Sequence, residues 1–428
     1  MWLLKYVEGK IDFRQFGGIK GNSITHYLIE FVNFILSNQD NKEPTVILAC
    51  MIDFSQAFNR QNHNILITKL SDLGVPAWLL KTIMSFLENR RMVVRYKGAT
   101  SSIKDLPGGG PQGTLLGLFL FIILINDVGF ENQLNNVGDI INCKKMLKEA
   151  NQIHLKYIDD LTIAESLPIK KSVRSIPMSE RIHPESYHER TGHALLPHKS
   201  QVLQQMGKIQ KYAKDNDMKL NLKKTKFMLF NRCRNYDFLP KVTMDGAEIE
   251  LVEQIKILGI ILTSDLKFHK NTEFIIKKAF KRIWILRRLK SLNATNKQLL
   301  EIYKTQVRSS LETAVPLWQS SLTISNKENL ERVQKVAFRI IYGSDYVSYK
   351  NACRKANIIP LAERRNKLCK KFAFKTLKHP KHKMLYKPNK KAKIDKRLRQ
   401  EKFVTPVTRT VRFENSPIPF LTRILNNT

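Results

Sequence analysis

Cysteine is scarce in this sequence, and its spacing is irregular. The 428 residues contain five cysteines, none in C-x-x-C spacing: Cys50, Cys143, Cys233, Cys353 and Cys369. An odd and scattered set supports neither a disulfide framework nor a zinc knuckle, because both use paired cysteines. The sequence therefore predicts an intracellular protein of a reducing compartment, nuclear or cytoplasmic.

Long apolar runs and an export signal are also missing. The longest apolar run, Leu115–Ile125, falls well short of the roughly 20 residues that a membrane-spanning helix needs. The first ten residues, MWLLKYVEGK, have too short an apolar stretch and too early an acidic residue for a secretory signal peptide. We therefore expect neither export nor a membrane partner.

Acidic residues are few compared with basic ones. The chain has 73 Lys and Arg against 37 Asp and Glu, a formal charge of +36. So large an excess would repel itself unless a polyanion neutralised it, and nucleic acid is the obvious polyanion. An anionic membrane surface, a ribosomal protein or a nucleolar scaffold would explain the charge equally well, so charge alone does not decide the function.

The apolar residues, 43% of the chain, suffice for a real core and follow a mixed pattern. A buried strand over 45–54 precedes two amphipathic helices that are separated at Gly74 and Pro76. A hairpin, MVVRYKG with SSIKDL, then leads to the glycine cluster PGGGPQG, which opens an apolar helix. IHLKYIDDLTIAE (153–165) reads as two strands around an acidic turn. This order predicts an α+β fold.

The second half of the sequence changes character. Residues 166–200, rich in Pro, Ser and His, have no apolar period and are expected to form an inserted loop. A helix over 201–215 and further strands up to Leu266 follow, and basic amphipathic helices begin near 271. The segment Lys370–Arg399 is crowded with basic residues, and we expect it to be a loosely ordered, polyanion-binding tail.

Three carboxylates stand out as candidate metal ligands. Asp53 falls at the end of the first predicted strand, and Asp159 and Asp160 occupy the predicted hairpin turn. Nucleotidyl transfer needs two divalent cations held by hard oxygen ligands, and converging aspartates supply these. Taken alone, an Asp-Asp turn is more often a solvated hairpin tip than a metal site.

The order of the motifs is more specific than any one motif. In chain order they are RQFGGIKGNSITHYL (14–28), IDFSQAFN (52–59), GGGPQGTLLG (108–117), YIDD (157–160), LNLKKTK (220–226) and ILGIIL (257–262). This succession resembles the reverse transcriptases of non-LTR (LINE-type) retrotransposons over roughly residues 12–345. The resemblance implies a right-hand polymerase fold with a palm of antiparallel sheet backed by helices, truncated fingers and a helical thumb.

The resemblance also implies a reaction and its partners. The expected activity is RNA-directed DNA synthesis from dNTPs on an RNA template and a DNA primer, with two Mg²⁺ ions, or Mn²⁺ in their place. Asp53 and Asp159 would be the principal metal ligands, with Asp160 beside them. The nucleotide would be bound by Phe54 through its carbonyl, Phe58, Gln112 and Lys224. Template and primer would be bound by Gly109, Gly110, Arg282, Arg287 and Arg288.

Several of these residues have a plainer alternative. Phe58 matches the family's steric gate against a 2′-hydroxyl, yet on its own it would be read as a core phenylalanine. Lys224 matches a lysine near the triphosphate, yet on its own it would be a solvated strand charge. We expect Trp284 to pack into its own domain, because half of such a helix must face a core.

The sequence departs from the family pattern in three places. Asn59 replaces a usual Asp and Ile158 a usual Ala, and neither position is a primary metal ligand. Only Met1–Phe13 precede Arg14, where the family has finger strands, and neither an endonuclease domain nor a zinc knuckle is expected. The alternatives are therefore a weak or inactive remnant that only binds nucleic acid, or a basic RNA-binding protein with no enzymatic past.

These readings give an expected division of the chain. It consists of a remnant of fingers (1–44), palm (45–165), inserted loop (166–200), rest of the palm (201–268), helical thumb (269–345) and basic C-terminal extension (346–428).

Overall fold

The computed structural model describes residues 2–42, 45–106, 108–128, 151–168, 200–231, 242–389 and 401–427. The chain divides into two compact units. One comprises Met1–Ser23 with Glu43–Val252, and the other comprises Ile24–Lys42 with Glu253–Thr428.

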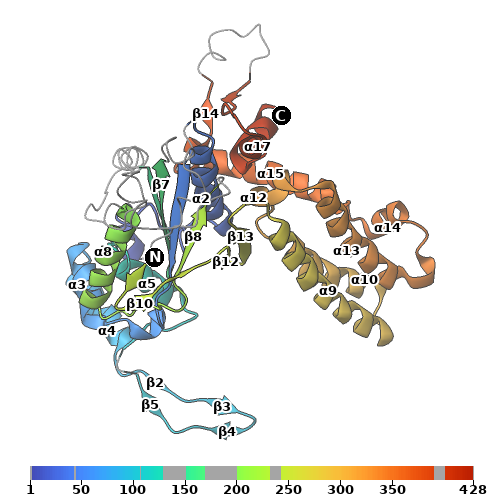
Figure 1. The fold of residues 1–428 in the computed structure, drawn as a ribbon. Coiled ribbons are helices and arrows are strands. Elements are labelled where there is room, and N and C mark those ends of the chain that lie inside the picture. The colour runs from blue at the N-terminus through green and yellow to red at the C-terminus, as the bar shows by residue number, and fades with distance from the viewer. Residues whose placement is uncertain are drawn as a thin grey trace. The chain divides into compact units, whose positions relative to one another are not determined.

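The first unit is built on a five-stranded sheet of order β11-β8-β1-β7-β6 (Figure 1). Central β1 pairs antiparallel with β7 and β8, whereas β11 runs parallel to β8. β1 is buried from its second residue onward, as its apolar, β-branched sequence predicts. The strands span β1 (Thr45–Ile52), β6 (Gln152–Tyr157), β7 (Asp160–Pro168), β8 (Lys226–Phe230) and β11 (Glu250–Leu251).

Helices pack against this sheet and share one apolar core with it. They are α1 (Trp2–Val7), α3 (His63–Asp72), α4 (Ala77–Leu87), α5 (Leu115–Leu124), α8 (Gln201–Asp215) and the 3-10 turn η1 (Ala57–Arg60). Asn62 and Ser200 cap α3 and α8, because their side chains accept hydrogen bonds from backbone N–H groups of the first turn. The expected α+β fold, a largely antiparallel sheet backed by helices, is thus confirmed.

Short strands complete the first unit. In Figure 1 an exposed hairpin extends away from the sheet, and it contains β2 (Arg91–Met92), β3 (Arg95–Tyr96), β4 (Ala99–Thr100) and β5 (Lys104–Asp105). A second small hairpin contains β9 (Thr243–Met244) and β10 (Ala247–Glu248). The predicted hairpin before the glycine cluster is therefore confirmed.

One expected boundary was wrong. β7 continues through Pro168, because Ser166, Leu167 and Pro168 still pair with β1. The inserted loop expected from residue 166 therefore begins later. Residues 169–199, which make up most of that loop, lie outside the described residues.

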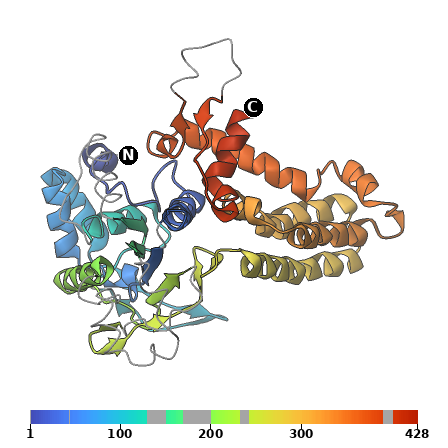
Figure 2. The same ribbon diagram turned by 45° about the horizontal axis from the view of Figure 1, so that its top comes forward.

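The second unit is mostly helical, and Figure 2 shows its long helices, drawn yellow to orange, packed side by side. α9 packs on α13, and α15 packs on α17. Its longer helices are α2 (Ile24–Gln39), α9 (His269–Ser291), α10 (Asn296–Ile302), α13 (Ile324–Tyr342), α14 (Tyr349–Ala356), α15 (Leu361–Lys378) and α17 (Pro417–Asn426). Shorter turns are η5 (Tyr303–Arg308), α11 (Ser309–Leu311), α12 (Val315–Trp318), η6 (Gln319–Ser321), η7 (Gly343–Asp345), η8 (His382–Leu385) and α16 (Val411–Glu414). Two hairpins pair β12 (Gln254–Ile257) with β13 (Ile260–Thr263) and β14 (Lys387–Pro388) with β15 (Phe403–Val404).

The start of the expected loose tail is in fact ordered. Lys370–Lys378 belong to α15, whose apolar face is buried at Leu361, Cys369 and Ala373. The lysines there lie on the outer face of an amphipathic helix. The expectation of a loosely ordered segment from Lys370 was therefore wrong for these residues. Residues 390–399 of the same segment lie outside the described part of the chain.

The described cysteines, Cys50, Cys353 and Cys369, are all free thiols and all buried. Cys50 lies in β1 between its partners Ile163 and Phe227, at the centre of the sheet. Every helix in the described ranges is too short or too polar to cross a membrane.

Candidate active site

Strand register brings Asp53 to the acidic turn. Ile52, the last residue of β1, pairs with Leu161 of β7, so the next residues along, Asp53 and Asp160, meet at the same end of the sheet. Tyr157 pairs with Asp160 and closes a two-residue turn made of Ile158 and Asp159. Ile158 has φ of 58°, a left-handed backbone conformation that a β-branched residue rarely adopts.

The three carboxylates affect one another electrostatically. Burial, together with the negative charges of Asp159 and Asp53, raises the pKa of Asp160 to about 6. Burial also raises the pKa of Asp159, again with a contribution from the charge of Asp53. Lys224 opposes both shifts. The site therefore gathers more negative charge than the protein itself neutralises.

One carboxylate oxygen of Asp53 is available to bind a cation. Its Oδ2 is buried and accepts no hydrogen bond from any described residue, and Nζ of Lys224 lies 3.6 Å from it. Lys224 is itself largely exposed and lies in the turn before β8, so it is a solvated charge as well as a neighbour of the site.

The donor set suits a hard divalent cation that also binds a ligand. Within the described ranges, no group of three or more His, Cys, Asp and Glu side chains could hold a metal ion by itself. Mg²⁺ is commonly bound through one or two carboxylates together with waters and substrate phosphates, so it does not require such a group. The buried, unpartnered oxygen of Asp53 and the raised pKa values of its neighbours fit that mode of binding.

Phe58 packs against the core, and its role as a steric gate stays a prediction. It lies on η1, five residues after Asp53, and its ring stacks on Phe121 of α5 with ring centroids 4.5 Å apart. The side chain is only partly buried where it packs on the core. Phe54, by contrast, is fully part of the core.

The glycine cluster packs against the chain itself. A Cβ on Gly109 would lie 2.8 Å from the carbonyl oxygen of Asn59, and one on Gly110 would lie 2.6 Å from Oε1 of Gln61. Gly109 also has φ of 80°, which favours glycine. Gly109 therefore lies against the backbone of Asn59 and Gly110 against the side chain of Gln61, and template binding by these glycines stays a prediction. Gln112 is exposed, and its Nε2 donates to Oδ1 of Asn59 at 3.1 Å.

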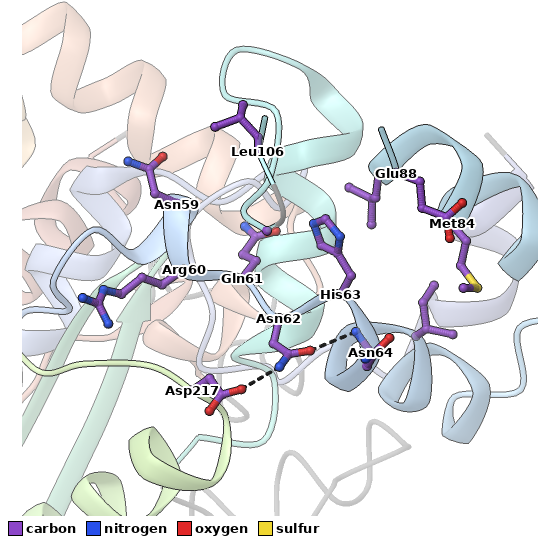
Figure 3. A pocket seen from close by; sticks show the side chains of 13 residues that line it. Asn59, Arg60, Gln61, Asn62, His63, Asn64, Met84, Glu88, Leu106 and Asp217 are labelled. Carbon is purple, nitrogen blue, oxygen red and sulfur yellow. Dashed lines mark hydrogen bonds between the residues drawn. The ribbon is translucent and has the colours of Figure 1, made fainter. Parts of the chain in front are cut away.

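A pocket of about 580 Å³ lies beside this loop (Figure 3). Nδ2 of Asn62 donates to Oδ2 of Asp217 at 2.6 Å, and this bond spans one wall. The side-chain amide of Gln61 is buried, and neither its Nε2 nor its Oε1 has a hydrogen-bond partner among the described residues. Sequence reasoning missed this pocket, because its polar lining residues other than Asn59 belong to no motif. Its lining is Asn59, Arg60, Gln61, Asn62, His63, Asn64, Ile67, Met84, Leu87, Glu88, Leu106, Gly108 and Asp217.

A buried ion cluster supports the strand that leads into the acidic turn. Nζ of Lys156, on β6, lies 2.8 Å from Oδ2 of Asp12, and Nε of Arg14 lies 2.8 Å from Oδ1. Burial lowers the pKa of Lys156 to about 8, while the charges of Lys156 and Arg14 hold that of Asp12 well below its usual range despite burial. Sequence reasoning missed this cluster, since Lys156 lies more than 140 residues from Asp12 and Arg14 in the chain.

The three arginines of α9 that were predicted to bind template and primer differ in exposure and hydrogen bonding. Nη1 of Arg282 donates to the carbonyl oxygen of Gln306 at 2.5 Å, whereas Arg287 and Arg288 are exposed. Trp284, on the same helix, is 64% exposed. The expectation that Trp284 packs inward was wrong, because Ile275, Ala279, Ile283 and Leu286 bury the opposite face of α9.

Comparison with known proteins adds independent evidence. The RNA-directed DNA polymerase from mobile element jockey of Drosophila funebris is 26% identical over 309 residues, which are 71% of this chain and 29% of that protein. The corresponding jockey polymerase of Drosophila melanogaster is 25% identical over 385 residues, 88% of this chain and 37% of that protein. The chain thus spans about a third of the length of the curated relatives it matches.

A telomerase from Candida tropicalis in complex with a fragment of telomeric RNA is 14% identical, with a TM-score of 0.38, over 99% of this chain and 52% of that one. The pattern of the family described as "Reverse transcriptase (RNA-dependent DNA polymerase)" matches residues 3–262. That match covers more than half of the sequence, and with the mobile-element relatives it shows that the chain belongs to the reverse transcriptase family, in the class of non-LTR retrotransposons.

Proposed function

We propose that this chain is the polymerase part of a non-LTR retrotransposon protein. It would transfer nucleotides from dNTPs to the 3′-hydroxyl of a DNA primer on an RNA template. The observation that carries the proposal is the meeting of Asp53 with the Asp159–Asp160 turn at one end of the sheet, where burial and neighbouring negative charge raise the pKa values of Asp159 and Asp160.

Asp53, Asp159 and Asp160 would hold two Mg²⁺ ions, or Mn²⁺, together with the carbonyl of Phe54 and the substrate phosphates. When bound, such ions activate the attacking hydroxyl and neutralise the charge of the leaving pyrophosphate. Burial first, and then repulsion between ionised carboxylates, raises the pKa values of Asp159 and Asp160, and a divalent cation would offset both effects.

The remaining residues would position the substrates. Lys224, close to Asp53 and largely exposed, can reach a triphosphate. Phe58, which is partly buried and stacked on Phe121, would exclude a ribose 2′-hydroxyl. Gln112, whose Nε2 donates to Asn59, would contact the nucleotide. Gly109 and Gly110 would contribute to template binding by shaping that loop rather than by direct contact.

The thumb would contribute binding rather than chemistry. Arg287 and Arg288 are exposed cations on α9 that can contact phosphates, and Arg282 adds charge beside them while bonded to Gln306. The same surface supports a second candidate function, nucleic-acid binding without catalysis, in a chain that carries a formal charge of +36.

Asp159→Asn tests the proposal. Primer extension on an RNA template should fall to background, while affinity for an RNA–DNA duplex should change less than about twofold, because the variant removes one anion from a strongly basic protein. Asp105→Asn, which removes the same charge from the exposed hairpin, is the matched control and should extend normally.

Two results would contradict the proposal. Equal extension by Asp159→Asn and the unaltered chain would exclude this aspartate and the proposed site. Tight duplex binding by the unaltered chain, with no extension under Mg²⁺ or Mn²⁺, would favour the second candidate function.

A further inference from the structure

The segment Arg14–Gly17 runs along the free edge of β6. The N–H of Lys156 donates to the carbonyl oxygen of Arg14 at 3.0 Å, and the N–H of Phe16 donates to that of Lys156 at 2.8 Å. Gln15 forms a parallel bridge with Lys156. These backbone bonds carry the segment toward the turn that holds Asp159.

The Gln15 side chain then reaches the turn itself. Its Oε1 accepts hydrogen bonds from the N–H of Ile158 and from the N–H of Gly17, both at 2.9 Å. Gln15 is only 2% exposed, and its Nε2 finds no partner within the described ranges. The side chain is therefore used purely as an acceptor that joins two backbone N–H groups.

Gly17 permits this contact by having no side chain. A Cβ at this position would lie 2.5 Å from Cγ1 and 2.7 Å from the backbone nitrogen of Ile158. No rotamer of a larger residue relieves a clash with a backbone atom. The chain thus brings two backbones together at the residue that directly precedes Asp159.

Ile158 needs to be held. It is β-branched and has φ of 58°, a conformation that persists in such residues only when the surroundings enforce it. The bond from Ile158 N–H to Gln15 and the wall formed by Gly17 are the contacts that enforce it.

We propose that Gln15 and Gly17 are positioning residues that lock the Ile158–Asp159 turn and so fix the carboxylate of Asp159 relative to Asp53. An edge strand alone would need only its backbone bonds. The additional hydrogen bond from the buried Gln15 side chain to Ile158 indicates that this segment also holds the conformation of the turn. The proposal rests on the proposed function only for the consequence that metal binding depends on this lock.

The first test measures Mn²⁺ affinity by electron paramagnetic resonance on the full chain. Gln15→Met keeps the length of the side chain but has no strong acceptor, and it should weaken Mn²⁺ binding about tenfold. Gln15→Met combined with Ile158→Gly should recover most of that affinity, because glycine adopts the left-handed conformation without enforcement. If extension is measurable, its rate at saturating dNTP should fall with little change in the KM for dNTP.

The control is the same substitution at a buried glutamine far from the turn in sequence. Oε1 of Gln334, in the second unit, accepts from the Tyr303 hydroxyl at 2.5 Å, so Gln334→Met removes a buried hydrogen bond without touching the turn. It should lower the thermal midpoint and leave Mn²⁺ affinity unchanged. An equal loss of affinity in Gln334→Met and Gln15→Met would overturn the proposal.

Hydrogen exchange separates failure of the lock from failure of the metal site. Peptides that contain Ile158 should be protected in the unaltered chain and exchange at least tenfold faster in Gln15→Met. Unchanged exchange would overturn the lock, whatever the metal data. If Asp159→Asn also left Mn²⁺ affinity unchanged, the proposed function would fail, while faster exchange in Gln15→Met would still support the lock.

Discussion

Nζ of Lys224 lies 3.6 Å from Oδ2 of Asp53, so one exposed lysine faces a carboxylate that accepts no hydrogen bond from the described residues. The positive charge of Lys224 also lowers the pKa values of Asp159 and Asp160, against the upward effect of burial. Burial is the larger influence on both aspartates, and Lys224 works against it.

Replacing Lys224 by methionine should raise the pKa of both aspartates. Since the ionised carboxylates bind the cation, the acid limb of Mn²⁺ binding and of extension should move to higher pH, by up to about one unit. Titration of binding between pH 5 and 8 would measure the shift. Lys223→Met, one position earlier and exposed, is the matched control. An acid limb that stays in place would mean that Lys224 is only a solvated charge.

Asp160 gives a prediction about stability. Its pKa is raised in the folded protein to about 6, above the ordinary value, so it stabilises the fold fully below about pH 4 and loses that contribution as pH rises through about 6. Without divalent metal, Asp160→Asn should therefore stabilise the protein at pH 7.5, on the order of 1 kcal/mol after allowance for its partial exposure. At pH 4 the gain should vanish. Thermal unfolding at the two pH values measures it, and equal effects at both would contradict the assigned cause.

Phe58→Val tests the steric gate. The smaller side chain should increase incorporation of ribonucleotides relative to deoxyribonucleotides by tenfold or more, and it should cost about 1–3 kcal/mol of stability because the stack on Phe121 is removed. Phe121→Leu removes the same stack and leaves the gate in place. If both variants change sugar selection equally, Phe58 is a core residue and not a gate.

The exposed face of α9 should govern duplex binding. Arg287→Gln with Arg288→Gln should weaken binding to an RNA–DNA duplex and reduce the dependence of log K on log salt by roughly 0.9 for each phosphate that is no longer neutralised. Arg282→Gln should have a smaller effect, because its guanidinium is bonded to the carbonyl of Gln306. Filter binding between about 50 and 200 mM salt measures both. A salt slope unchanged in the double variant would exclude this face.

Trp284→Ala separates packing from binding on the same helix. With 64% of its surface exposed, the ring should contribute little to folding, so the thermal midpoint should change by less than about 2 °C. Duplex affinity should fall severalfold if the ring contacts bases or sugars. A large drop in stability would restore the packed role that the sequence suggested.

Local sequence patterns were sufficient to predict the strands that hold the aspartates and the helices around them. Asp53 and the YIDD turn lie at the ends of strands whose apolar, β-branched residues identify them directly, and motif order linked them. The capped helices α3 and α8 also followed from local sequence. What the sequence predicted best was therefore what is determined within about ten residues.

The contacts that the sequence did not reveal are distant ones. Gln15 bonds to Ile158, and Asp12 pairs with Lys156, and no local period links such residues. A buried lysine has no sequence signal that distinguishes it from a solvated one. The same ambiguity explains why the lysines of α15 suggested a loose tail and why Trp284 was expected inside the core.

The buried thiols make the two units separately observable. Cys50 sits between two sheet partners, and burial raises its pKa far above the usual range, so it can react with an alkylating reagent only when the sheet opens. Burial likewise raises the pKa of Cys369, on α15 of the second unit, to about 12. The rate at which an alkylating reagent labels each thiol under native conditions therefore measures how often the surrounding unit opens. No additional cysteine has to be introduced for this measurement.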